Sequence, residues 1–167
     1  MKAVLLSINP KWCELVASGK KTIEVRKTKP KIKPPFKCYI YETKGEAETP
    51  FIDEDGHMDF HGRGQVIGEF VCDKITMDIP GYKDYGVGYW DILDGSCLTC
   101  DELFNYGRWG ALYGWHISDL VIYDTPKELN EFKKPSEYRV MSYQKRKSYL
   151  DGFTRPPQSW CYVEEED

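Results

Sequence analysis

The first 26 residues predict a strand, a short helix and a second strand, with a clear break at each junction. Residues 2–8 form an apolar run of strand length. Asn9 and Pro10 are typical of a helix start, with Asn9 as the N-cap and Pro10 at the first helical position. Gly19 can take the left-handed conformation that ends a helix. Residues 22–26 then alternate polar and apolar with the period of a strand.

The rest of the chain adds strands and few helices. Four further segments have strand composition: residues 36–41, 65–75, 114–123 and 159–163. Thr99 and Glu102 form a capping box that predicts a second helix, and residues 126–129 predict a one-turn helix. Five or six short strands with two or three short helices, and no regular βαβ alternation, favour an α+β fold. We expect a compact β-barrel with the helices at its rim.

With 167 residues, the chain predicts one domain that spans residues 1–167. Residues 44–63 and 133–153 are polar and lack a clear period, so we expect them to be loop insertions. No window approaches the roughly 18 apolar residues of a membrane span. The apolar run at the N-terminus is too short for a signal peptide. We therefore expect a cytoplasmic protein without membrane contact.

Positive charge gathers in two segments, although the net charge is −4. Residues 20–37 hold eight basic residues and one acidic residue, and residues 133–155 hold seven basic and two acidic residues. Such segments indicate an anionic partner, such as nucleic acid or a nucleotide, because a binding face responds to local potential. Solvated loops rich in lysine would give the same count.

The six cysteines are expected to be reduced, because nothing in the sequence indicates secretion. Cys97 and Cys100 have the spacing of a zinc knuckle or a redox pair, and His57 and His61 lie four residues apart. The four side chains together could form a zinc site. Isolated pairs of this kind often have no metal role, so we expect neither a metal nor a cofactor.

Residues 18–27 bring the most chemistry into one short stretch. On the predicted strand, Thr22, Glu24 and Arg26 share one face, while the apolar residues between them face the core. A helix end with two lysines precedes this face. The segment thus gathers a hydroxyl, a carboxylate and several cations. The alternative is an exposed strand face on which Glu24 pairs with a neighbouring cation.

Several segments resemble the ASCH domain of the PUA-like superfamily. They are residues 6–12, 18–27, 64–70 and 112–118, and residues 126–129 and 155–163 resemble the small bacterial and phage branch. The resemblance implies a PUA-like barrel with a cleft between the first helix and the sheet, and a role in RNA binding or modified-nucleoside chemistry. The ligand-binding residues that we expect are Ser7, Lys11, Lys20, Lys21, Thr22, Glu24, Arg26, Gln158, Ser159 and Trp160.

Some small family members hydrolyse N4-acetylcytidine with a lysine and a threonine. Here Lys21 is kept, but Glu24 stands where that threonine would be. A carboxylate does not replace an alkoxide nucleophile, so the resemblance supports this activity only in part. If the protein is an enzyme, Lys21 and Glu24 are its candidate catalytic residues.

Aromatic side chains beside cations are typical of sites for single-stranded RNA. Among the five tryptophans, Trp160 is the first choice for stacking, because Gln158 and Ser159 next to it can bond to a base. His116 is expected to be structural. Three functions stay open: a module that binds RNA or a nucleotide, an amidohydrolase for an N4-acylated cytidine, and an interaction domain with solvated basic loops. We favour the first. Turnover of a modified nucleoside would distinguish the second.

Overall fold

The computed structural model describes residues 1–52, 56–83, 86–135 and 152–165. Its main sheet has six strands, in the order β10-β1-β3-β6-β9-β2. These strands are β1 (Lys2–Ile8), β2 (Ile23–Arg26), β3 (Phe36–Glu42), β6 (Val66–Asp78), β9 (Leu112–Lys127) and β10 (Trp160–Glu164). β1 runs antiparallel to β10 and parallel to β3, and β2 runs antiparallel to β9.

Two small sheets and three α-helices complete the described fold. The small sheets pair β4 (Glu46–Ile52) with β5 (Met58–His61) and β7 (Gly81–Lys83) with β8 (Gly86–Gly88). The helices are α1 (Pro10–Ala17), α2 (Trp90–Ser96) and α3 (Cys100–Gly107), followed by the 3-10 turn η1 (Leu129–Glu131). None of the helices in the described ranges has the length and apolarity that a membrane span needs. The predicted α+β class, with five or six main strands and two or three short helices, is confirmed.

The chain divides into two compact units. The first contains residues 1–14, 37–70 and 120–167. Its core includes Tyr39, whose ring meets that of Phe132 edge-on at 4.9 Å between centroids. The buried members of this core are Ala3, Leu5, Tyr39, Tyr41, Val66, Leu129, Phe132, Phe153 and Val163.

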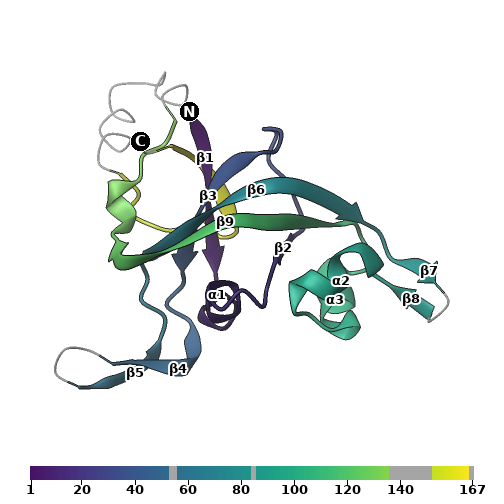
Figure 1. The fold of residues 1–167 in the computed structure, drawn as a ribbon, viewed down its shortest axis with the longest axis horizontal. Coiled ribbons are helices and arrows are strands. Elements are labelled where there is room, and N and C mark those ends of the chain that lie inside the picture. Colours follow the sequence, from purple (N-terminus) through teal and green to yellow (C-terminus); the bar gives the residue numbers. More distant parts are fainter. Residues whose placement is uncertain (53–55, 84–85, 136–151, 166–167) are drawn as a thin grey trace. The chain divides into compact units, whose positions relative to one another are not determined.

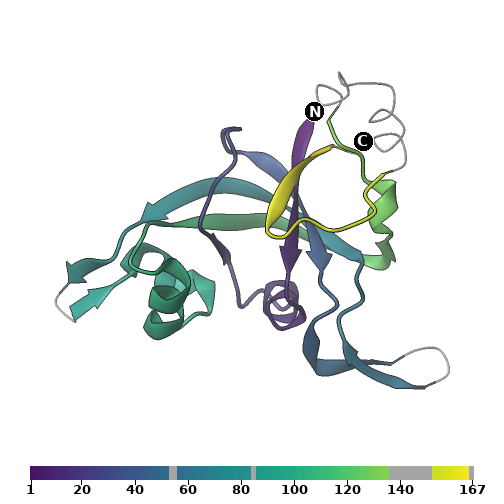
Figure 2. The same cartoon turned by 180° about the vertical axis from the view of Figure 1, so that it is seen from behind.

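The second unit contains residues 15–36 and 71–119. Its core joins β2 and β9 to α2 and α3, which Figures 1 and 2 both show as neighbours. The buried members are Ile23, Val25, Tyr89, Ile92, Leu103 and Leu112. Gly114 on β9 permits the close approach of α2, because a Cβ there would lie 2.6 Å from Ile92 Cγ2.

Three local predictions need correction. Residues 44–63 were expected to be a loop, but most of them form the β4–β5 hairpin, which Figure 1 shows extending beyond the foot of β3. Pro50 argues against a strand in the sequence, because proline cannot donate a backbone hydrogen bond. In a two-stranded sheet both strands are edge strands, where proline is tolerated. Residues 126 and 127 end β9, and the helical turn begins only at Leu129. Helix α2 was missed altogether.

The other expectations on domain organisation stay predictions. Most of the expected insertion at residues 133–153 lies outside the described residues. The prediction that residues 1–167 form one domain is likewise untested.

Candidate functional site

The turn between α1 and β2 places the side chain of Lys21. α1 ends at Ala17; Gly19 follows with a φ of 74°, and its N–H donates to Val16 O at 2.9 Å. The backbone N–H of Thr22 donates to Gly95 O of α2, also at 2.9 Å. These backbone bonds fix the start of β2 against the C-terminal end of α2. They turn the side chain of Lys21 inward.

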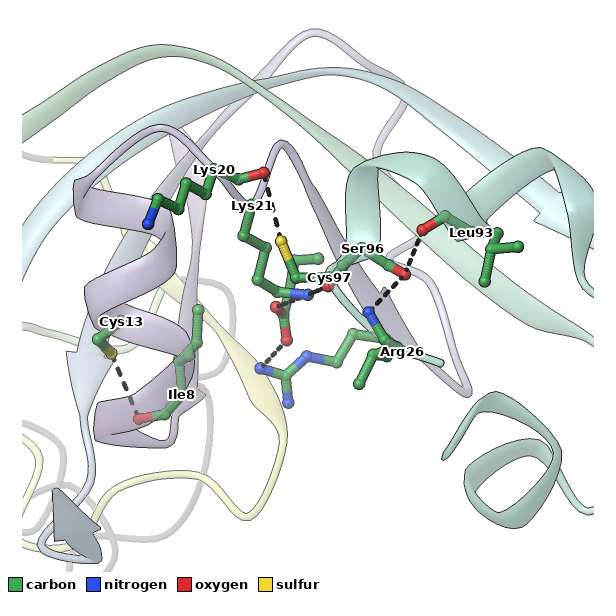
Figure 3. Close-up of polar contacts among 10 residues, drawn as sticks. Ile8, Cys13, Lys20, Lys21, Arg26, Leu93, Ser96 and Cys97 are labelled. Carbon is green, nitrogen blue, oxygen red and sulfur yellow. Dashed lines mark hydrogen bonds and ion pairs between the residues drawn. The ribbon is translucent and has the colours of Figure 1, made fainter. Parts of the chain in front are cut away.

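Lys21, Glu24 and Arg26 form a buried charge cluster in the second unit (Figure 3). Lys21 Nζ donates to Ser96 O at 2.6 Å and lies 3.5 Å from Glu24 Oε2. Arg26 Nη2 lies 3.0 Å from Glu24 Oε1. The side chains of Lys21, Glu24 and Arg26 are only 2%, 9% and 9% exposed. One carboxylate therefore serves two buried cations.

This burial contradicts the alternative of an exposed strand face, although Glu24 does pair with neighbouring cations as that alternative expected. Thr22 is exposed, but Glu24 and Arg26 are buried. Glu24 lies opposite Trp115 on β9, and the fully buried Trp115 ring meets Phe36 edge-on at 5.8 Å. The alternation of residues 22–26 correctly predicted strand β2. Alternation does not show whether the face with the polar residues is exposed to solvent or covered by another part of the chain. Of the three residues expected to share this face, Thr22 alone is exposed.

Exposed lysines begin where the buried cluster ends. Lys20 is exposed before β2, and the segment after β2 exposes four more: Lys27, Lys29, Lys31 and Lys33. We call residues 27–33 the lysine segment. Lys27 Nζ lies 4.8 Å from the centroid of the Tyr106 ring, and Lys29 Nζ lies 5.6 Å from that of Tyr113. Cations over aromatic faces are attracted by the ring quadrupole.

The remaining expected ligand residues belong to the first unit. Ser7 N–H donates to Ser159 O at 3.0 Å, and Ser7 Oγ donates to Pro157 O at 2.6 Å. Trp160 pairs with Leu6 across β10 and β1, and it is partly buried. Ser7, Ser159 and Trp160 are thus neighbours. The Ser7 hydroxyl proton is engaged by the backbone.

Two other residues of the expected set are exposed in the first unit. Lys11 lies on α1 with its Nζ 5.0 Å from the centroid of the Trp12 ring. Gln158 precedes β10.

The zinc alternative gains no support from the described residues. Among them, no group of three or more His, Cys, Asp or Glu side chains is arranged to hold a metal ion. His61 Nδ1 instead lies 2.8 Å from Asp59 Oδ1, and Cys97 Sγ donates to Lys20 O at 3.3 Å.

His116 has the surroundings of a structural residue, as expected. Its Nε2 lies 2.8 Å from Thr76 Oγ1. Burial holds its pKa below the ordinary value, and Lys74 acts in the same direction.

The sequence analysis missed a cavity and a pair of exposed aromatic residues. In the first unit, a cavity of about 710 Å³ has polar lining from Tyr41, Lys44, Glu128 and Asn130. Burial raises the pKa of Tyr41, and the charge of Glu128 adds to the rise. These residues come from separate elements, so no local pattern reveals them.

The pair of exposed aromatic residues, Tyr106 and Trp109, lies at the end of α3. The sequence does indicate this exposure. Trp109 lies between Gly107 and Gly110, after the end of the predicted helix, and so outside the apolar face of that helix.

About half of the chain matches a known protein family. Residues 6–89 match the ASCH domain. The chain belongs to the ASCH domain family. The match includes the buried charge cluster and the lysine segment, but it ends before α3. No curated protein matches this ASCH chain in sequence.

Solved structures of ASCH from Zymomonas mobilis share its fold. A mutant of that protein has 18% sequence identity and a TM-score of 0.60, and covers 99% of this chain and 92% of its own. The unmutated protein has the same identity and TM-score, with coverages of 98% and 88%. At this identity the similarity shows the fold alone. Together with the family match over residues 6–89, it confirms the predicted ASCH fold.

Proposed function

We propose that this ASCH protein binds RNA, with the lysine segment as the track for the phosphates. The observation that carries the proposal is the charge of residues 25–36, which hold five basic residues and no acidic one. Four of the five are exposed lysines. Phosphate contacts by lysine and arginine supply most of the non-specific affinity for nucleic acids. The membership of the ASCH family, which is PUA-like, supports RNA as the partner.

The fifth basic residue, Arg26, has a different task. Its Nη2 lies 3.0 Å from Glu24 Oε1, and its side chain is 9% exposed. Arg26 is the last residue of β2, and its buried contact with Glu24 holds that end of the strand in place. The exposed lysines begin at the next residue, Lys27. We therefore expect the affinity for RNA to depend on the exposed lysines, and the stability of the fold to depend on the buried charge cluster.

The test is the salt dependence of binding to a fluorescein-labelled RNA 12-mer, followed by anisotropy. Each phosphate contact on a single strand contributes about −0.7 to the slope of log K against log salt. Combining Lys27→Ala with Lys29→Ala should therefore reduce the slope by about 1.4 if each lysine meets one phosphate.

The matched control combines Arg63→Ala with Lys74→Ala, which changes the net charge equally at two exposed basic residues elsewhere. The control should keep the wild-type slope. Equal slopes for wild type and both double variants would remove the lysine segment from the binding site, and a wild type that binds no RNA would refute the function.

The alternative, hydrolysis of an N4-acylated cytidine, has less support from the geometry. It needs Lys21 to reach a substrate. The Lys21 side chain is 2% exposed, and its ammonium donates to Ser96 O and lies beside Glu24. These contacts favour a structural role for both residues. Release of cytidine from N4-acetylcytidine by the purified protein would revive the alternative.

A further inference from the structure

Helix α3 ends in an unusual turn that exposes a tryptophan. Arg108 and Trp109 both have positive φ values, 50° and 63°, in the left-handed region that favours glycine. Two successive non-glycine residues in that region are strained, and such strain gathers at functional sites. Trp109 is 67% exposed, although tryptophan is among the side chains most buried on average.

Hydrogen bonds and a ring contact hold this turn in place. Arg108 N–H donates to Phe104 O at 2.8 Å, and Gly110 N–H donates to Gly107 O at 3.0 Å. The hydroxyl of the buried Tyr89 donates to Gly110 O at 2.7 Å. The Trp109 ring lies 4.6 Å from the Phe104 ring, measured between centroids. One side of the indole therefore has support from the protein, while most of its surface meets solvent.

A second exposed ring and two cations belong to the same region. Tyr106, three residues before Trp109, is 37% exposed and has Lys27 Nζ 4.8 Å from its ring centroid. Tyr113 lies opposite Arg26 in the β2–β9 register, and Lys29 Nζ lies over its ring. The lysine segment thus reaches the aromatic residues of α3 and β9. We call Tyr106 and Trp109 the aromatic platform.

We propose that the aromatic platform stacks the unpaired bases of single-stranded RNA whose phosphates contact the lysine segment. The inference rests on the proposed function and names its substrate class. Rings beside a cationic track bind single strands, because every base has a π-face to stack. In a duplex the base faces are already stacked on one another, so they are not available to stack on the aromatic platform. The positive charge of the adjoining segment favours an anionic strand over an apolar protein partner.

The test compares Trp109→Ala and Trp109→Phe on labelled oligouridine and on an abasic 12-mer with the same phosphates. Loss of one stacked base should weaken oligouridine binding about 5- to 150-fold in Trp109→Ala. Trp109→Phe keeps a ring and should recover most of the affinity. On the abasic strand, the wild type and both variants should bind alike. Ile79→Ala removes another exposed apolar side chain and should leave binding unchanged.

The outcomes separate the two proposals. If Trp109→Ala binds oligouridine as the wild type does, while the lysine variants weaken binding, the platform is refuted and RNA binding stands. If the wild type binds no RNA, both fail. If Trp109→Ala instead abolishes self-association in sedimentation and leaves RNA affinity intact, the platform docks a second copy and the inference is wrong. Circular dichroism of each variant confirms that the fold is retained.

Discussion

Removal of the carboxylate at position 24 should destabilise the protein strongly. Glu24→Gln keeps the volume of the side chain but removes the negative charge between Lys21 and Arg26. Their side chains are 2% and 9% exposed, so water cannot replace the lost partner. Breaking a buried pair by removing one member costs about 3–5 kcal/mol. That is a large part of the roughly 5–15 kcal/mol that stabilises an ordinary domain.

The assay is urea unfolding followed by tryptophan fluorescence, with the slope compared between variants. Lys21→Met is the informative partner variant, because it leaves Glu24 and Arg26 as a neutral pair. Its expected cost is smaller, about 1–3 kcal/mol, from the Ser96 carbonyl left without its donor. Lys20→Met is the matched control at an exposed lysine and should stay within about 0.5 kcal/mol.

Glu24→Gln should lower the free energy of unfolding more than Lys21→Met does. If Glu24→Gln costs under about 1 kcal/mol, the two cations do not need the carboxylate and the account of the cluster is wrong. If Lys21→Met costs more than Glu24→Gln, the bond to Ser96 outweighs the charge balance.

Three further predictions follow from particular contacts. The lowered pKa of His116 means that its stabilising contribution is present above the unfolded pKa near 6.5 and is lost as the pH falls towards the folded pKa. His116→Gln should remove that part of the pH dependence in melting curves between pH 7 and 5. Gly114→Ala should destabilise by about 1–3 kcal/mol in urea, because its Cβ would lie 2.6 Å from Ile92 Cγ2. N4-acetylcytidine incubated with the protein should remain intact in chromatography, and cytidine release that vanishes in Lys21→Ala would contradict this.

Local signals with a clear chemical cause predicted their elements well. The capping box of Thr99 and Glu102 is present at α3, where both reciprocal hydrogen bonds form. The end of α1 shortly before Gly19 also follows from a single residue type. Helix α2 escaped prediction because Tyr89, at its N-cap, makes no side-chain capping bond. Its start depends instead on Asp78, whose carboxylate accepts from the Asp91 N–H at 2.7 Å. That contact joins distant parts of the chain.

The candidate site was predicted in its charges but not in its exposure. The sequence places Lys21, Glu24 and Arg26 together, and their mutual contacts follow from strand geometry. They are buried beside residues far along the chain: Glu24 lies opposite Trp115 of β9, and Lys21 donates to Ser96 O of α2. No local pattern carries that information. For the same reason, Trp160 was the first choice for stacking, whereas Trp109 is the more exposed side chain.

The segment that carries the ASCH resemblance is explained largely by folding. Gly19 turns the chain, Ile23 and Val25 enter the core, and Glu24 holds two buried cations. These roles would be needed whatever the ligand, so a match over this segment indicates the fold more than the partner. Ligand contacts must then come from side chains that folding leaves exposed. In the second unit these side chains include the lysines from Lys27 onward and the aromatic platform, and the platform lies beyond the residues that match the family. Differences in binding among proteins of this fold should therefore arise at these exposed positions, where a change of side chain leaves the buried cluster intact.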